Sequence, residues 1–259
     1  MKKKSRVDSN NNGNIGDMFG FGLFGRGKDE LLSMILSDIA KKKKIWIATV
    51  NPEFVMETRR DNKFLEILQN KTSYNLVDGI GLAWALKTVT SNWKLVTGIK
   101  VGVEILIGKH RENLIAGADL IDDLCGLAEK NGLTVYFYGG WDDRSRRTAD
   151  YFVAKYPKLK VMGAQAEDFD FKTEVDFLFV CRAMKKQEEW IDQNLDRLNC
   201  KLVIGLGRTF DYYSGELSRA PKWMQNMGLE WLYSLITDGS RRKRKLELLK
   251  FAQEFYFRN

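Results

Sequence analysis

The chain has 259 residues, of which 44% are hydrophobic and 29% are charged, so it can bury the core of one large domain or two small ones. Its formal net charge of +8 indicates an anionic partner, and charge alone does not choose among nucleic acid, phospholipid headgroups and a substrate that carries a diphosphate. No apolar run approaches the roughly 20 residues of a membrane-spanning helix. Polar residues follow the basic N-terminal ones, so we expect no signal peptide.

The cysteine and histidine content restricts the chemistry that the chain can perform. Cys125, Cys181 and Cys200 form no CxxC pair, and two of them lie in apolar segments, so a reducing cytoplasm is expected. His110 is the single histidine, which excludes a histidine-based metal site and any Ser-His-Asp triad that does not use it. We expect His110 to lie at the surface.

The order of polar and apolar segments predicts the fold class. Residues 1–27 mix lysine, asparagine and glycine with an aromatic cluster that has neither helical nor strand periodicity, which predicts a flexible leader. Short β-branched or aromatic runs then alternate with amphipathic stretches, which predicts an α/β domain with a Rossmann-like, mostly parallel sheet over residues 28–220 and a basic amphipathic helical appendage over residues 221–259. Residues 87–107 fit neither pattern and are expected to form an inserted hairpin or an extra helix. Strands are predicted at residues 45–50, 74–77, 133–138, 159–162, 175–181 and 201–205, and helices after Pro52, Gly79, Asp119, Asp143, Lys186 and Pro221.

Polar residues and glycines follow several of the predicted strands. Ligands bind at the carboxyl ends of the strands in an open parallel sheet, so Thr49, Asn51 and Asp78 are candidate site residues. Asp78 is suited to act as a general base or as a helix N-cap, and its spacing alone favours the cap. Gly139 and Gly140 would let backbone amides approach a diphosphate, or would form an ordinary turn, and no GxGxxG or Walker motif accompanies them.

Asp168-Phe169-Asp170 has the DxD form with which many nucleotide-sugar enzymes hold a divalent cation. The tripeptide lies in an acidic, loop-like segment and follows no strand directly, so we interpret it as a solvated turn. We therefore predict no metal ion and no other cofactor.

A series of short motifs occurs in a specific order from residue 46 to the C-terminus. They are Thr49-Val50-Asn51, Asp78-Gly79, Gly117-Ala118-Asp119-Leu120, Val135-Tyr136-Phe137-Tyr138-Gly139-Gly140, Tyr156-Pro157, Lys186-Gln187-Glu188, Thr209-Phe210-Asp211, Gly215, Arg219-Ala220-Pro221 and Gly228-Leu229-Glu230-Trp231-Leu232. Each motif is short, but their order and spacing together are specific. In this set the chain resembles the WecG/TagA/CpsF glycosyltransferases.

The resemblance implies a metal-independent, inverting transfer of an N-acetylmannosamine-type or related hexosyl unit. The implied donor is a UDP-sugar, and the implied acceptor is an undecaprenyl-diphosphate-linked sugar, so the enzyme would be cytoplasmic and peripheral at the inner face of the cell membrane. The family's proposed base corresponds to Asp78, and Thr49 and Asn51 match a motif that lines the same pocket. Gln187 matches the family's catalytic-site glutamine, and Asp211 matches an aspartate on the nucleotide side.

The leaving UDP gains negative charge, and without a metal ion that charge must be met by cationic side chains, backbone amides or a helix N-terminus. The family's Arg-x-x-Gly sequence has Leu114 at the arginine position in this chain, and Arg111 lies one helical turn earlier. Either Arg111 substitutes for that arginine or the acceptor contact is lost. The candidate cations for the diphosphate are Arg219, Arg241, Arg242 and Arg244.

The C-terminal appendage combines a basic run with an apolar face. The run Arg241-Arg242-Lys243-Arg244-Lys245 precedes Leu248, Phe251, Ala252 and Phe255, which are spaced as one side of a helix. Each basic residue near an anionic leaflet contributes about 1 kcal/mol of attraction, so the segment is predicted to dock on an anionic membrane surface. The alternative is a terminal helix that packs on the domain core and leaves its charges in solvent.

A noncatalytic basic protein that binds nucleic acid or an anionic surface is the competing interpretation, and the basic run supports it. No nucleic-acid motif with interleaved aromatic residues is present, so no nucleic-acid partner is expected. An NAD-dependent oxidoreductase is disfavoured because no glycine fingerprint follows the first strand. The sequence leaves open which sugar is transferred, which glycan accepts it and whether the chain forms a homo-oligomer.

Overall fold

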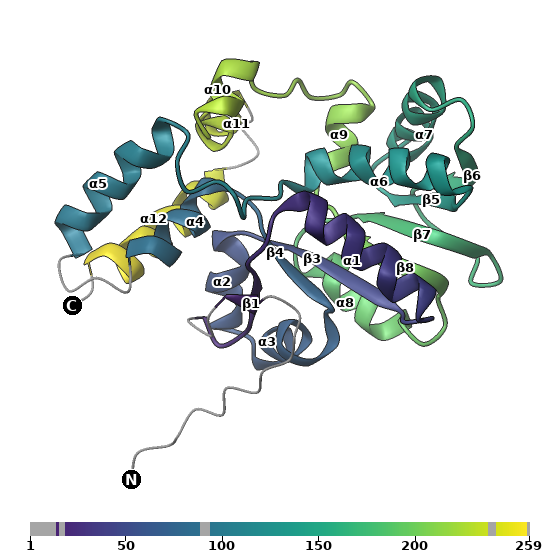
Figure 1. Ribbon diagram of the computed structural model, residues 1–259, viewed down its shortest axis with the longest axis horizontal. Helices are drawn as coiled ribbons and strands as arrows, with labels where there is room; N and C mark the ends of the chain where they lie inside the picture. The colour runs from purple at the N-terminus through teal and green to yellow at the C-terminus, as the bar shows by residue number, and fades with distance from the viewer. Residues whose placement is uncertain (1–13, 16–18, 89–93, 238–241, 258–259) are drawn as a thin grey trace, which may run out of the picture.

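A six-stranded parallel sheet forms the centre of the computed structural model, which describes residues 14–15, 19–88, 94–237 and 242–257 (Figure 1). The strand order is β4-β3-β8-β7-β5-β6, and every neighbouring pair is parallel. The α/β class and the parallel sheet are therefore confirmed. The strands are β3 (Ile45–Val50), β4 (Tyr74–Val77), β5 (Thr134–Gly139), β6 (Lys160–Gln165), β7 (Glu174–Cys181) and β8 (Asn199–Gly205).

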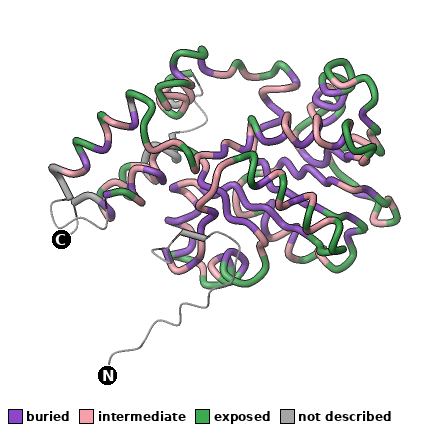
Figure 2. Tube along the Cα trace, in the orientation of Figure 1, coloured by how far each residue is buried: buried purple, intermediate pink, exposed green. Residues whose placement is uncertain are grey.

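Helices cover both faces of this sheet. Ile45 and Ile47 of β3 contact one helical layer, whereas Trp46 and Ala48 contact the other. Strands buried on both faces consist of nearly continuous apolar residues, and Figure 2 shows burial concentrated along the central strands. One layer contains α1 (Lys28–Ala40), α6 (Gly117–Asn131), α7 (Arg144–Lys155) and α9 (Thr209–Tyr213); the other contains α2 (Pro52–Thr58), α3 (Asn62–Glu66), the π-helix η1 (Ile67–Lys71) and α8 (Lys186–Asn194).

The remaining helices lie at the end of the molecule opposite β6 (Figure 1). α5 lies within residues 87–107, so the extra-helix alternative is confirmed for this segment. It packs on α4 at Gly98 and Gly102, which face the Trp84 ring, and Trp84 Nε1 donates to the Gly98 carbonyl oxygen at 2.8 Å. The helices at this end are α4 (Ile80–Thr88), α5 (Lys94–Leu106), α10 (Lys222–Asn226), α11 (Glu230–Thr237), α12 (Arg242–Ala252) and the π-helix η3 (Gln253–Phe257).

The aromatic cluster before α1 is part of the core. Phe19 is 2% exposed and meets the ring of Phe255 edge to face, with centroids 5.3 Å apart. The expected leader therefore contributes packed side chains from Phe19 onward, because aromatic residues without regular spacing can still fill a gap between elements that are distant in sequence. Two short strands, β1 (Asn14–Ile15) and β2 (Leu23–Phe24), form an antiparallel pair in this segment.

The apolar face of the C-terminal appendage packs on the domain. Phe251 and Phe255 are 2% and 7% exposed and belong to the same buried cluster as the inner face of α2. An ion pair of 2.5 Å between Arg60 Nη2 and Glu247 Oε2 also joins α12 to the residues after α2. The structure thus agrees with the core-packing alternative for these apolar residues, since burying two aromatic rings stabilises the folded state directly.

Candidate active site

Asp78 and Asn51 follow neighbouring parallel strands. Val50 of β3 pairs with Val77 of β4, and the Asp78 backbone NH donates to the Val50 carbonyl oxygen at 2.8 Å. Asp78 is half-buried, and Gly79 beyond it has φ +92°, which turns the chain toward α4. The sheet therefore brings the candidate base and Asn51 to adjacent positions on one edge, as the sequence predicts for residues that follow parallel strands.

Asn51 and Thr49 make structural hydrogen bonds at this edge. Asn51 Oδ1 accepts from the backbone NH groups of Glu53 and Phe54 at 2.9 and 3.3 Å, so Asn51 is the N-cap of α2. A substrate contact from Asn51 would therefore come from its amide nitrogen. Thr49 is 5% exposed, and its hydroxyl donates to the Gly205 carbonyl oxygen at 2.9 Å, which links β3 to β8.

Gln187 is the second residue of α8. It is 1% exposed, and its Oε1 accepts from the Gly207 backbone NH at 2.9 Å while its Nε2 donates to Glu188 Oε1 at 2.6 Å. The amide oxygen therefore holds the loop after β8, and the amide nitrogen bonds to the neighbouring Glu188 of α8. Glu188 is fully buried, and its Oε2 accepts from the Lys185 backbone NH at 2.9 Å. Burial raises the pKa of the Glu188 carboxyl to about 7.

The glycine pair permits a close approach of two strand ends. Gly139 pairs with Cys181, and the φ angles of Gly139 and Gly140 are +95° and +79°. A Cβ atom on Gly139 would lie 2.4 Å from the Cys181 carbonyl oxygen, and the Gly140 NH donates to the same oxygen at 2.5 Å. Backbone packing thus requires both glycines. Because the Gly140 amide is already used, a diphosphate would have to be met by other groups nearby.

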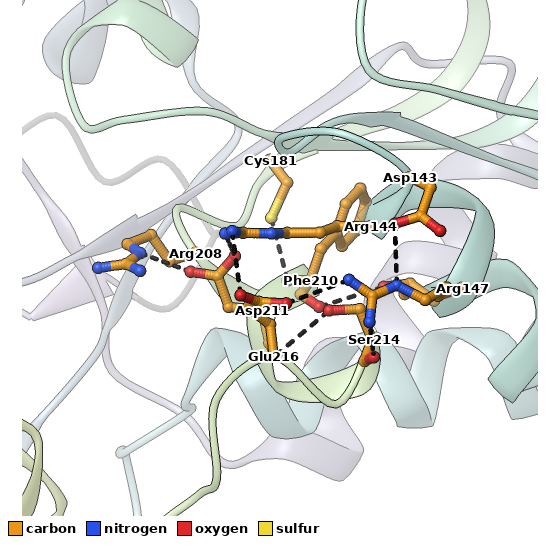
Figure 3. A network of polar contacts seen from close by, with 10 residues as sticks. Asp143, Arg144, Arg147, Cys181, Arg208, Phe210, Asp211, Ser214 and Glu216 are labelled. Carbon is orange, nitrogen blue, oxygen red and sulfur yellow. Dashed lines mark hydrogen bonds and ion pairs between the residues drawn. The ribbon is translucent and has the colours of Figure 1, made fainter. Parts of the chain in front are cut away.

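Asp211 is surrounded by arginines (Figure 3). Its carboxylate is 1% exposed, and it accepts from Arg144 Nη1 at 2.6 Å and from Arg208 Nε at 2.5 Å. A direct contact between this carboxylate and a nucleotide would have to displace an arginine. Arg144 and Arg208 were not singled out from the sequence, although an arginine-rich helix start after β5 and an arginine after Gly207 were available as signals.

The arginines predicted for the diphosphate and the acceptor have other partners. Arg219 Nη1 donates to Asp119 Oδ1 at 2.5 Å and Nη2 to Glu230 Oε1 at 2.9 Å, so two carboxylates offset its charge. Arg111 donates to one backbone carbonyl of α5 at 2.6 and 3.1 Å and also to a carbonyl of α10. Both side chains tie helices together. Arg241 lies outside the described residues, and Arg242 and Arg244 are described only by their backbone in α12.

The DxD tripeptide lies beside an aromatic cavity. Phe169 is 7% exposed, packed edge to face against Tyr136 and Tyr138, while Asp170 Oδ1 accepts from the Lys172 backbone NH at 3.0 Å. Within the described ranges, no group of three or more His, Cys, Asp or Glu side chains could hold a metal ion. The cavity, of about 450 Å³, is lined by Tyr138, Glu167, Asp168, Phe169, Phe171, Arg182 and Trp190.

The buried Glu188 carboxyl predicts a pH-dependent stability. In the folded protein the pKa of the Glu188 carboxyl is about 7, whereas its ordinary value is 4.5. The contribution of the protonated carboxyl to stability is therefore full below pH 4.5 and is lost as the pH rises through 7. The free energy of unfolding of the parent, minus that of Glu188→Gln, should fall by about 2 to 3 kcal/mol between pH 5 and pH 8. Urea denaturation measures both values, with Glu189→Gln on the same helix as the control. A difference that is constant with pH would contradict the raised pKa.

Comparison with known proteins identifies the family. The chain matches the model of the Glycosyl transferase WecG/TagA/CpsF family over residues 17–259. It is 31% identical over 216 residues to the N-acetylglucosaminyldiphosphoundecaprenol N-acetyl-beta-D-mannosaminyltransferase of Bacillus subtilis (strain 168), covering 80% of this chain and 77% of the relative. It is 27% identical over 221 residues to the enzyme of the same name from Bacillus spizizenii (strain ATCC 23059 / NRRL B-14472 / W23), covering 82% and 79%. The chain therefore belongs to the WecG/TagA/CpsF family and is a glycosyltransferase.

Proposed function

We propose that this glycosyltransferase moves an N-acetylmannosamine-type or related hexosyl unit from a UDP-sugar to an undecaprenyl-diphosphate-linked sugar, with inversion and with Asp78 as the general base. One observation carries the proposal: Asp78 is a half-buried carboxylate at the carboxyl end of β4, next to Asn51 at the end of β3. The names of the two Bacillus relatives support the sugar and the lipid-linked acceptor. Membership of an enzyme family removes the support for a noncatalytic basic protein.

The proposed reaction is a single displacement. A hydroxyl of the acceptor attacks the anomeric carbon of the donor while Asp78 takes the hydroxyl proton. The bond between that carbon and the UDP oxygen breaks, and UDP leaves with the bonding electrons. No metal ion takes part, so cationic side chains and backbone amides meet the charge on UDP. Thr49 and Gln187 act as positioning residues, because their side chains bond to Gly205 at the end of β8 and to Gly207 in the loop after it.

We further propose that the helical end of the molecule lies against the anionic inner face of the cell membrane. Ile99 and Val103 on α5 and Ile107 just after it are spaced by about one helical turn. Their side chains are 63%, 55% and 67% exposed. Val101 and Ile105, on the opposite side of the helix, are buried. A helix that is apolar on both sides is normally covered on both sides, and an interfacial helix places such a side in the headgroup region.

Nearby residues also suit a lipid interface. Lys100, which follows Ile99 on α5, is exposed. Basic residues next to an apolar face favour binding to an anionic leaflet. No helix of the described segments is long and apolar enough to cross a bilayer. Because the apolar face of α12 is buried against the domain, we assign the surface that contacts lipid to α5 and its neighbours. Other helices at this end of the molecule (Figure 1) also carry exposed apolar side chains, which are Trp223 on α10 and Trp231 and Ile236 on α11.

Replacing Asp78 by asparagine tests the proposed function. The amide keeps the shape of the side chain but cannot take the proton, so turnover should fall by about 100- to 10,000-fold. Acceptor-dependent release of UDP from UDP-N-acetylmannosamine measures it, with an N-acetylglucosaminyl lipid diphosphate as acceptor. Asp170→Asn, a loop carboxylate bonded to a backbone NH, is the control and should turn over like the parent. Parent-like turnover of Asp78→Asn would show that Asp78 is not the base.

The α5 surface is tested by removing its apolar side chains. The double variant Ile99→Gln and Val103→Gln should bind anionic liposomes at least about tenfold more weakly in a sedimentation assay, because it loses apolar area that the membrane would cover. Val153→Gln and Met162→Gln, at exposed apolar positions on α7 and β6, form the matched control and should bind like the parent. Equal liposome binding by both double variants would contradict the assignment of this surface.

A further inference from the structure

Lys185, the N-cap of α8, has a backbone conformation that residues with a side chain rarely adopt. Its φ and ψ angles are +72° and −54°, whereas a glycine takes up a positive φ at little cost. The Lys185 NH donates to Glu188 Oε2 at 2.9 Å, and the Lys185 carbonyl oxygen accepts from the Glu189 NH at 2.8 Å. The strained turn therefore makes the hydrogen bonds with which α8 begins.

This turn directs two polar side chains inward. Gln187 and Glu188, the second and third residues of α8, are both buried. A Cβ atom on Gly205 would lie 2.8 Å from Gln187 Nε2 and 3.0 Å from Glu188 Oε1, so the two side chains pack directly against the end of β8. Gln187 also accepts from the Gly207 NH. Because this packing is close, a change in the start of α8 would displace the loop after β8 at the carboxyl edge of the sheet.

Two carboxylates hold the side chain of Lys185. Its Nζ lies 2.8 Å from Oε1 of Glu57, in α2, and 2.9 Å from Oδ2 of Asp61, the N-cap of α3. All three side chains are partly buried, so solvent screens these ion pairs less than pairs in open water. Met184, one residue earlier, packs against the buried cluster that contains Phe54 of α2. The strained turn is thus tied to α2 on both sides of its backbone bend.

We propose that Lys185 is a positioning residue for the transfer reaction, because its two ion pairs stabilise the strained turn that places Gln187 and the loop after β8. This role rests on the proposed function, which puts the reacting groups at this edge of the sheet. A strained residue persists where surrounding interactions hold it, and charge-assisted hydrogen bonds are among the strongest available. Since both carboxylates bond to the ammonium, Lys185 acts through the turn and not as a group that binds substrate charge.

Three substitutions at Lys185 separate the ion pairs from the strain. Lys185→Met keeps the strain but removes the charge, so kcat should fall about 10- to 100-fold with little change in KM, since a misplacement of about 1 Å can cost 100-fold. Lys185→Gly also removes the charge but adopts the turn without strain, so its kcat should exceed that of Lys185→Met. Lys185→Arg keeps a cation and should restore most of the turnover. Acceptor-dependent release of UDP from UDP-N-acetylmannosamine measures all three.

Another ion pair of the same helix provides the matched control. Lys71 Nζ lies 2.5 Å from Asp192 Oδ1 of α8, and the Lys71 side chain is 39% exposed, compared with 34% for Lys185. Lys71→Met removes this pair away from the strained turn and should turn over like the parent. The double variant Glu57→Gln and Asp61→Asn, in which asparagine keeps the cap of α3, should match Lys185→Met. Adding Lys185→Met to it should lower kcat little further, because both changes remove the same interaction.

Hydrogen exchange of the Gly207 NH, followed by nuclear magnetic resonance, reports the position of the loop without any substrate. Exchange should be faster in Lys185→Met than in the parent, and slower in Lys185→Gly than in Lys185→Met. In an active parent, a parent-like kcat of Lys185→Met, or a kcat of Lys185→Gly no higher than that of Lys185→Met, would overturn the role of Lys185 and leave the proposed function intact. A parent that releases no UDP from this donor would contradict the proposed function, and the exchange rates would then decide the role of Lys185: parent-like exchange in Lys185→Met would overturn it.

Discussion

The parallel pairing of the strands is the constraint on which the rest of the structure depends. Because all six strands run in one direction, residues that follow each strand along the chain arrive at a single edge. Pairing of Val50 with Val77 fixes Asp78 on one part of that edge, and pairing of Gly139 with Cys181 fixes the arginine-bearing loops on another. Helices bury both faces of the sheet, so the packing of the core sets the geometry of the site.

Local pairing of charges determines what the basic composition can do. The net charge of +8 indicates an anionic partner, but Arg219 is offset by carboxylates and Arg111 is bonded to backbone carbonyls. Arg144 and Arg208 bond to the buried carboxylate of Asp211, and Arg144 also approaches Glu216 at 3.5 Å. The fold thus gives each of these arginines a specific partner. Composition alone does not show these pairings.

Much of the fold could be predicted because parallel strands are continuous apolar runs that end in glycine or polar residues, and β3 and β4 lie at the predicted positions. Asp78 could also be placed at the edge, since that rule needs only local sequence. Strand order is nonlocal, so the meeting of Arg144 with Arg208 could not be predicted, nor the burial of Gln187. The packing of Phe19 on Phe255 joins segments that are far apart in the sequence, and Phe19 lies in a cluster without periodic spacing.

A single displacement with Asp78 as the general base is tested most directly by the anomeric configuration of the transferred sugar. Nuclear magnetic resonance of the purified lipid-linked product, made from a donor whose sugar is α-linked to UDP, determines that configuration. One displacement inverts the anomeric carbon, so the product should carry a β linkage. An α linkage would require two displacements or an ionised intermediate attacked from the same face, and would contradict a mechanism with one general base and no covalent intermediate.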